Sequence, residues 1–112
     1  MAIPRQDQFI LPFLQTLSDG KEHTRSQIKS QLVRYFGITP VEEKHMSGVT
    51  TTVINRIAWC DVYFVKAGFV AKCRHPSDNM QDVFQITPVG LQELNKHPYQ
   101  ITIAYLQTFY RV

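Results

Sequence analysis

The sequence has little that would support secretion, membrane insertion or a disulfide framework. It has two cysteines, Cys60 and Cys73, and they do not form a CxxC pair. We expect both thiols to be reduced and buried, with a disulfide as the minor alternative. No stretch approaches 18 apolar residues, and the polar residues of Pro4–Asp7 precede the first hydrophobic cluster, where a signal peptide would be apolar. These absences predict a cytoplasmic protein with no membrane partner.

The motifs that mark many enzymes are also missing. No GxGxxG, GxxxxGK[ST] or GxSxG sequence occurs, and the nearest Cys/His pair, in Cys73–His75, lacks two further ligands for zinc. Glu42–Lys44, with Asp19 upstream, superficially fits the carboxylate and lysine pattern of metal-dependent nucleases. Such ligands must converge from adjacent strands, and Glu42 is better explained as a helix cap. We therefore predict no catalytic residue, no metal and no cofactor.

The composition is that of one compact domain with a mild positive charge. The chain has 112 residues, of which 44% are hydrophobic and 19% charged, and a net charge of +3. The stretch from Lys21 to Arg74 contains nine basic and four acidic residues, so its net charge is +5, and the net charge of the rest of the chain is −2. Such an imbalance permits a polyanionic partner, although a solvated surface of mixed charge is the simpler alternative.

The first half of the chain predicts three helical segments. Apolar residues recur at three- and four-residue spacing over Gln6–Leu17, and Pro12 predicts a kink or a restart of that helix. Thr24 and Gln27 form a capping box, and Gly37 ends the helix that follows. Thr39–Glu42 repeats the same start signal, with proline at the first helical position.

A longer helix is predicted over Thr50–Lys66. At 100° per residue, its apolar positions Val53, Ile57, Cys60 and Phe64 share one narrow arc. A second stripe, with Asn55 beside it, is able to touch a partner and consists of Thr52, Arg56, Trp59, Tyr63 and Lys66. Asp61 falls next to the apolar arc, and the sequence names no partner for it.

The remaining segments predict a hairpin and a helical end. Residues 69–73 and 83–86 are predicted to form two antiparallel strands, and the residues between them, 74–82, are typical of a turn. Thr87–Gly90 starts a short helix, and an amphipathic tail follows over Ile101–Tyr110. This order predicts an α+β fold: a winged helix-turn-helix that is mostly helical, with a small antiparallel hairpin as its wing, plus a C-terminal helical tail. We assign residues 1–97 to the domain and 98–112 to a tail or linker.

Several short motifs follow one another along most of the chain: Ile3-Pro4, Leu11-Pro12, Asp19-Gly20-Lys21-Glu22-His23, Phe36-Gly37, Asn55-Arg56, Trp59, Tyr63, Lys66-Ala67-Gly68, Ile86-Thr87 and Gly90. In this order and approximate spacing they resemble a known family, the N-terminal winged-helix domain of Mrr-type methyl-directed restriction endonucleases. The resemblance implies the target-recognition part of a restriction system directed at modified DNA, without the downstream nuclease domain and its metal ligands. The tail is similar to the segment that leads to that nuclease domain in longer relatives.

Double-stranded DNA is therefore the predicted partner, with modified bases as candidate targets. In the major groove asparagine can pair with adenine and arginine with guanine, the first turn of a helix offers N–H groups to phosphate, and wing residues can hold the backbone. The predicted DNA-binding residues are Thr50, Thr51, Thr52, Asn55, Arg56, Lys72, Arg74, His75, Asn79, Lys21, His23 and Arg25.

Each of these assignments has a simpler alternative. Threonines before a helix are commonly caps, Arg56 can instead pair with an acidic neighbour, and the remaining basic residues can be ordinary solvated surface. We expect Trp59 and Tyr63 to be buried in the core or half-buried against it, rather than to stack on bases. Two other functions remain open: a protein-interaction or dimerisation module, with a homodimer as one form, and a transcriptional regulator of the same fold.

Overall fold

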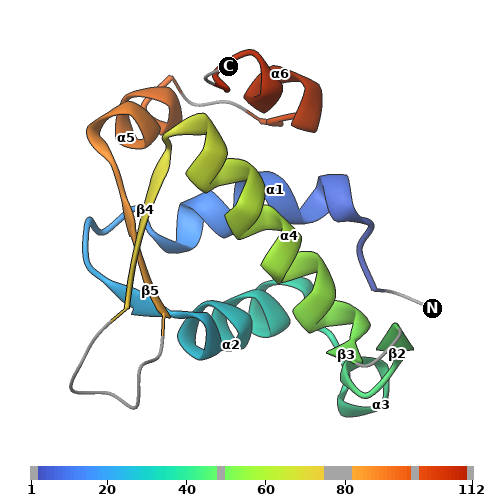
Figure 1. Cartoon of the computed structure of the whole chain (residues 1–112). Helices are drawn as coiled ribbons and strands as arrows, with labels where there is room; N and C mark the ends of the chain where they lie inside the picture. Colours follow the sequence, from blue (N-terminus) through green and yellow to red (C-terminus); the bar gives the residue numbers. More distant parts are fainter. Residues whose placement is uncertain (1–2, 48–49, 75–81, 97–98, 111–112) are drawn as a thin grey trace.

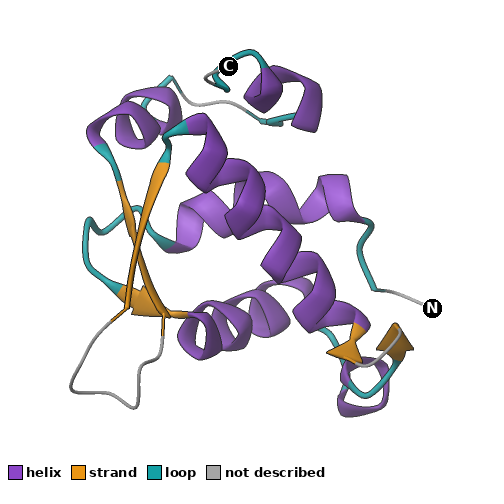
Figure 2. Cartoon of the chain, viewed as in Figure 1, coloured by secondary structure: helices purple, strands orange, loops and turns teal. Residues whose placement is uncertain are grey.

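The computed structural model describes residues 3–47, 50–74, 82–96 and 99–110 as a helical α+β structure (Figure 1). A three-stranded antiparallel sheet lies beside the helices, and a two-stranded ribbon lies near the start of α4 (Figure 2). The elements in chain order are α1 (Gln6–Thr16), β1 (His23–Thr24), α2 (Arg25–Phe36), α3 (Pro40–Glu43), β2 (Met46–Ser47), β3 (Thr50–Thr51), α4 (Thr52–Ala67), β4 (Val70–Arg74), β5 (Asp82–Ile86), α5 (Pro88–Leu94) and α6 (Ile103–Gln107).

The predicted helix boundaries are largely confirmed. They depend on capping hydrogen bonds between residues that are close in the sequence. Thr24 accepts a hydrogen bond from the Gln27 backbone N–H, which starts α2, and Gly37 ends it in the left-handed conformation. The same box at Thr39 starts α3. The helix α1 is one continuous element that contains Pro12, so it does not restart there.

The long helix begins two residues later than predicted. Thr51 is its N-cap, and Thr50 and Thr51 form β3, which pairs with Met46–Ser47 in β2. The backbone of these threonines is therefore extended and hydrogen-bonded to a neighbouring strand. A two-residue strand has no periodic pattern of its own, and for that reason the sequence did not reveal this ribbon.

The main sheet has three strands in the order β1-β5-β4, one more than predicted. The two predicted strands pair antiparallel from Val70 with Ile86 to Arg74 with Asp82. The additional strand, β1, pairs His23 with Phe84 and Thr24 with Val83. Its two residues immediately precede α2. Thr24 was interpreted only as the cap of that helix, so the sequence analysis did not predict a strand there.

The core lies between the helices and the sheet. Five phenylalanines are fully buried, and Phe13 stacks on Phe64 with ring centroids 5.6 Å apart. The predicted inner arc of α4 is confirmed, since Val53, Ile57 and Cys60 are fully buried with Phe64. The core therefore holds the long helix by one face and leaves its opposite face outside.

Asp61 on α4 is buried and finds its partner on α2. The Arg25 guanidinium donates to the Asp61 carboxylate at 2.7 Å, and its charge also lies 5.4 Å from the centre of the Phe84 ring. Burial raises the pKa of the Asp61 carboxyl, and the Arg25 hydrogen bond and charge oppose that rise. This ion pair supplies the partner that the sequence did not name for the charged residue beside the predicted apolar arc.

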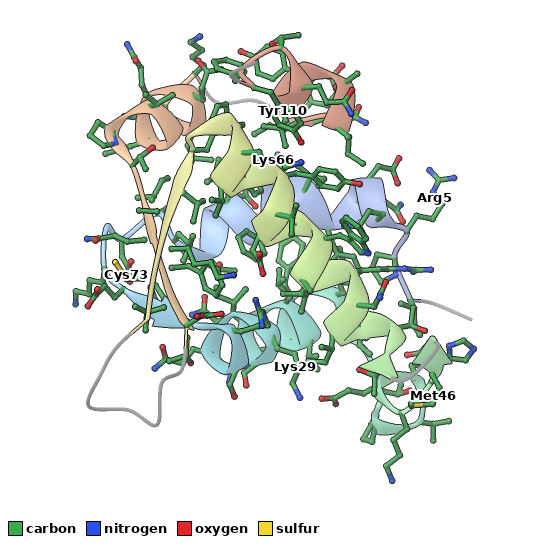
Figure 3. All side chains as sticks on the ribbon, viewed as in Figure 1. Arg5, Lys29, Met46, Lys66, Cys73 and Tyr110 are labelled. Atoms are coloured by element: carbon green, nitrogen blue, oxygen red, sulfur yellow. The ribbon has the colours of Figure 1, made fainter. Side chains whose placement is uncertain are left out.

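The C-terminal tail packs on the rest of the molecule. Leu106 and Ile101 belong to the same hydrophobic core as α1 and α4, and the Phe109 ring meets Phe69 edge-on at 4.8 Å. Figure 3 shows Tyr110 beside the carboxyl end of α4, close to Lys66. Residues 99–110 thus complete the core, whereas their role as a linker toward another domain stays a prediction.

Candidate nucleic-acid interface

The first turn of α4 forms the centre of the predicted site, and its backbone donors are partly used within the protein. The Thr51 hydroxyl accepts a hydrogen bond from the Ile54 N–H at 3.3 Å. The Thr52 N–H donates to the His45 carbonyl at 2.7 Å. These two N–H groups are therefore not available to a phosphate, and the alternative that a threonine acts as a cap holds for Thr51.

Thr52 is also withdrawn from the surface. Its side chain is 7% exposed, and its hydroxyl lies 2.8 Å from Nδ1 of His45. This contact joins the start of α4 to the turn that follows α3. The sequence placed Thr52 on the partner-facing stripe, but the turn before the helix covers it. Thr50 contributes its backbone to β3.

Asn55 and Arg56 differ in how they are held. The Arg56 guanidinium donates to the carbonyl of Pro4, and the Arg56 carbonyl accepts from the Gln6 side chain at 2.8 Å. Arg56 therefore fastens the N-terminal segment to α4, instead of pairing with an acidic neighbour. Asn55 is half-buried, and within the described ranges no hydrogen bond or ion pair holds its side chain.

A shallow groove of about 370 Å³ lies beside the start of α4. Its lining residues are Lys29, Pro40, Glu43, Lys44, Thr51 and Ile54. Figure 3 shows Lys29 extending from α2 on the side of the molecule where α4 begins. The Lys29 ammonium pairs with Glu43 at 3.0 Å, and Lys44 is exposed.

Sequence reasoning omitted Lys29 and Lys44 from the site. One signal was present for Lys29, because it lies four residues after Arg25 and so shares a face of α2 with it. Nothing local marked Lys44. It joins the groove because the short helix α3 turns the chain back toward α4.

The basic residues near the start of α2 are mostly engaged. His23 pairs with Asp19 at 2.9 Å, and this contact lowers the pKa of the Asp19 carboxyl. Arg25 is held by the buried Asp61. Lys21 is exposed, and its backbone N–H donates to Asp19 at 2.9 Å.

The predicted wing is described only at its base. Lys72 on β4 is exposed and lies 3.5 Å from the carboxylate of Asp82 on β5. The backbone of Arg74 pairs with Asp82, but its side chain is not among those described. His75 and Asn79 lie outside the described residues. Their predicted contacts with DNA therefore stay predictions.

The aromatic pair on α4 corrects one expectation. Trp59 is 49% exposed, so the prediction that it is buried or half-buried is wrong, whereas Tyr63 is half-buried as expected. The two rings are tilted at 30° with centroids 6.0 Å apart. Trp59 is exposed because the 100° periodicity places it on the outer side of the helix, away from the Ile57 and Cys60 arc.

The thiols also differ from each other. Cys60 is buried, but Cys73 is exposed, so the expectation of two buried thiols is half wrong; both are free. Burial and the neighbouring Asp61 raise the pKa of the Cys60 thiol, which makes it a poor nucleophile. The Gln6 amide donates to its sulfur at 3.2 Å.

No group of three potential metal ligands occurs among the residues that the structure describes. Within the same ranges, none of the helices has the length and apolar character needed to cross a bilayer. The structure is thus a small α+β domain, and two of its lysines, Lys29 and Lys44, line a groove near the start of its longest helix.

The chain belongs to the Mrr N-terminal domain family, whose model matches residues 7–96. This confirms the resemblance drawn from the sequence and identifies the chain as a domain associated with restriction systems. The family describes the N-terminal domain and not the nuclease part. No curated protein matches the chain, and no solved structure does.

Proposed function

We propose that this domain is a winged helix that binds double-stranded DNA and serves as the non-catalytic, target-recognition part of a restriction system directed at modified bases. The observation that carries the proposal is the placement of α4. Its amino end and the open ends of β4 and β5, at Arg74 and Asp82, lie on the same side of the molecule, with α2 between them (Figure 1). A helix end and a hairpin on one side can enter a groove and hold its backbone together.

The order of the elements supports the winged-helix assignment. Strand β1 lies between α1 and α2, α4 precedes the hairpin, and β5 sits in the middle of the sheet. The last strand of the hairpin is thereby fixed to the start of α2. This arrangement holds the hairpin and the two helices of the proposed site in one rigid frame.

The contacts divide the basic residues into available and committed ones. Both ion pairs are partly open to solvent, and a solvent-screened pair contributes only about 0 to 1 kcal/mol. Lys29 can therefore exchange Glu43, and Lys72 can exchange Asp82, for a phosphate at little cost. Arg25 cannot, because leaving a buried carboxylate unpaired costs about 3 to 5 kcal/mol. We therefore assign phosphate contacts to Lys29 and Lys44 together with Lys21 and Lys72.

Base recognition is assigned mainly to Asn55. Its amide is free of the internal contacts that occupy Thr51, Thr52 and Arg56, and it lies in the first turn and a half of α4. An asparagine side chain can pair with adenine through two hydrogen bonds, and Thr51 beside it has a methyl group for thymine or a methylated base. Arg74, His75 and Asn79 are assigned to the backbone at the wing.

Duplex binding should fall steeply with salt. With about four phosphates contacted, the logarithm of the association constant should fall against the logarithm of salt concentration with a slope near −3.6. The measurement is a fluorescence-anisotropy titration of matched modified and unmodified duplexes at two salt concentrations. Tighter binding to the modified duplex would support the proposed target class, and a flat salt response would contradict DNA binding altogether.

Asn55→Ala should weaken binding to the preferred duplex by about 1 to 3 kcal/mol, roughly 5- to 150-fold, and relax the discrimination between duplexes. The slope with salt should stay unchanged, because no phosphate contact is lost. Asn95→Ala is the matched control, since Asn95 is an exposed asparagine at the end of α5, far from the proposed site (Figure 1). An equal loss in both variants, or none in Asn55→Ala, would count against base recognition by α4.

A further inference from the structure

An exposed methionine lies beside the start of α4. Met46 is 55% exposed on β2, and Figure 3 shows it on the side of the molecule where α4 begins. A single exposed apolar side chain is ordinary on a protein surface, so exposure alone gives Met46 no function. What distinguishes Met46 is the set of side chains and backbone groups around it.

Strand pairing fixes the position of Met46 relative to α4. Met46 pairs with Thr51, the N-cap of α4, in the antiparallel ribbon of β2 and β3. At the adjacent position, the Thr52 N–H donates to the His45 carbonyl at 2.7 Å. Met46 and Thr51 are therefore a pair without hydrogen bonds to each other, and the side chains of such a pair lie closest together.

The two sides of the ribbon differ in what they contact. On one side, Nδ1 of His45 lies 2.8 Å from the hydroxyl of the buried Thr52, which holds the ribbon against α4. Side chains alternate along a strand, so Met46 and Thr51 lie on the other side. Thr51 also lines the groove beside the start of α4. Met46 is thus an apolar side chain next to the groove to which phosphate contacts are assigned.

The chemistry of this pair selects one group on DNA. The Thr51 hydroxyl accepts the Ile54 N–H, so the part of Thr51 that remains for a partner is its methyl group. In the major groove the apolar group on a base edge is the C5 methyl of thymine. We propose that Met46, together with Thr51, binds this methyl group and makes the domain prefer thymine there. The inference rests on the proposed function, because the ribbon must enter the major groove with α4.

Replacing thymine by uracil removes only the methyl group, so a pair of duplexes tests the contact. Their strands alternate adenine with thymine or with uracil, so that every binding register presents the same base edges. In fluorescence anisotropy the unmodified protein should bind the thymine duplex about fourfold more tightly, the effect of burying roughly one methyl group. Met46→Ala should lose most of this preference by binding the thymine duplex more weakly, and its slope with salt should stay unchanged.

Two control variants should keep the preference for thymine. Met46→Leu supplies a similar apolar surface. Val41→Ala is the matched control, because Val41 is 81% exposed on α3 and does not line the groove. Circular dichroism checks that all variants fold.

The outcomes separate this inference from the proposed function. Equal binding of both duplexes by the unmodified protein, a preference that survives in Met46→Ala, or an equal loss in Val41→Ala would overturn the methyl contact and leave duplex binding intact. Binding of neither duplex would overturn the proposed function, and this inference with it.

Discussion

Arg25→Met is expected to lower the free energy of unfolding by about 3 to 5 kcal/mol at neutral pH. The substitution removes the partner of Asp61, whose side chain is only 3% exposed. Methionine keeps much of the volume against Phe84 but supplies no donor, so the carboxylate is left charged and unpaired in the core or must take up a proton. Urea unfolding followed by circular dichroism measures the loss.

The loss should shrink in acid. Burial already raises the pKa of Asp61 above its ordinary value of 3.8, and removing the Arg25 hydrogen bond and charge raises it further. A carboxyl with a raised folded pKa favours the folded state when it is protonated, and this stabilisation is lost as the pH rises through that pKa. The difference in the free energy of unfolding between Arg25→Met and the unmodified protein should therefore be smaller at about pH 4 than at about pH 7.

Two further variants separate the ion pair from a general effect of losing a charge on α2. Arg34→Met removes an exposed arginine from the last turn of the same helix and should cost less than about 0.5 kcal/mol. The double variant Arg25→Met with Asp61→Leu should recover most of the stability, because a buried pair can be replaced by apolar residues at little cost. A loss that is equal at both pH values, or not recovered in the double variant, would show that the pair is not the cause.

Gly90→Ala is expected to lower the free energy of unfolding by about 3 kcal/mol, although the residue lies in a helix. Alanine normally stabilises a helix by about 1 kcal/mol relative to glycine. Here, however, a Cβ atom would fall well inside van der Waals contact with the backbone carbonyl of Phe69 and 2.9 Å from Cγ1 of Ile86. The Phe69 carbonyl cannot move away easily, because it accepts the Thr87 N–H at 2.9 Å.

The sign of the change is the diagnostic result. Gly37→Ala is the control, since Gly37 is held at a φ of 64° with nothing within 4 Å of an added Cβ. It should cost about 1 kcal/mol from backbone strain alone. Thermal unfolding of both variants gives the comparison. A stabilised Gly90→Ala protein would show that α5 moves freely on the sheet, against the close approach seen at Phe69.

The parts of the fold that were predicted correctly depend on neighbouring residues. The boxes at Thr24 and Thr39 and the left-handed stop at Gly37 are local hydrogen-bonding arrangements, so they can be read from three or four consecutive residues. The buried arc of α4 follows from helical periodicity. The short strands β1 and β3 were missed because two residues carry no period, and pairing alone makes them strands.

The candidate site was harder to predict because its side chains are decided by distant partners. Arg25 is separated by 36 positions from Asp61, and Arg56 by 52 from Pro4. Both arginines were predicted to contact DNA, Arg56 at a base and Arg25 at the backbone, yet both make contacts within the fold. Lys29 and Lys44 show the reverse, since only packing brings them to one groove.

By itself the sequence determined the positions of the main helices and the hairpin, the inner face of α4, and membership of the family. Capping, periodicity and motif order are properties of the sequence itself, so they can be recognised without a structure. Tertiary structure alone decided which basic side chains are held in internal contacts and that the C-terminal tail joins the core. Burial and ion pairing depend on contacts between residues that are far apart in the sequence, and the sequence alone does not show which of them come into contact.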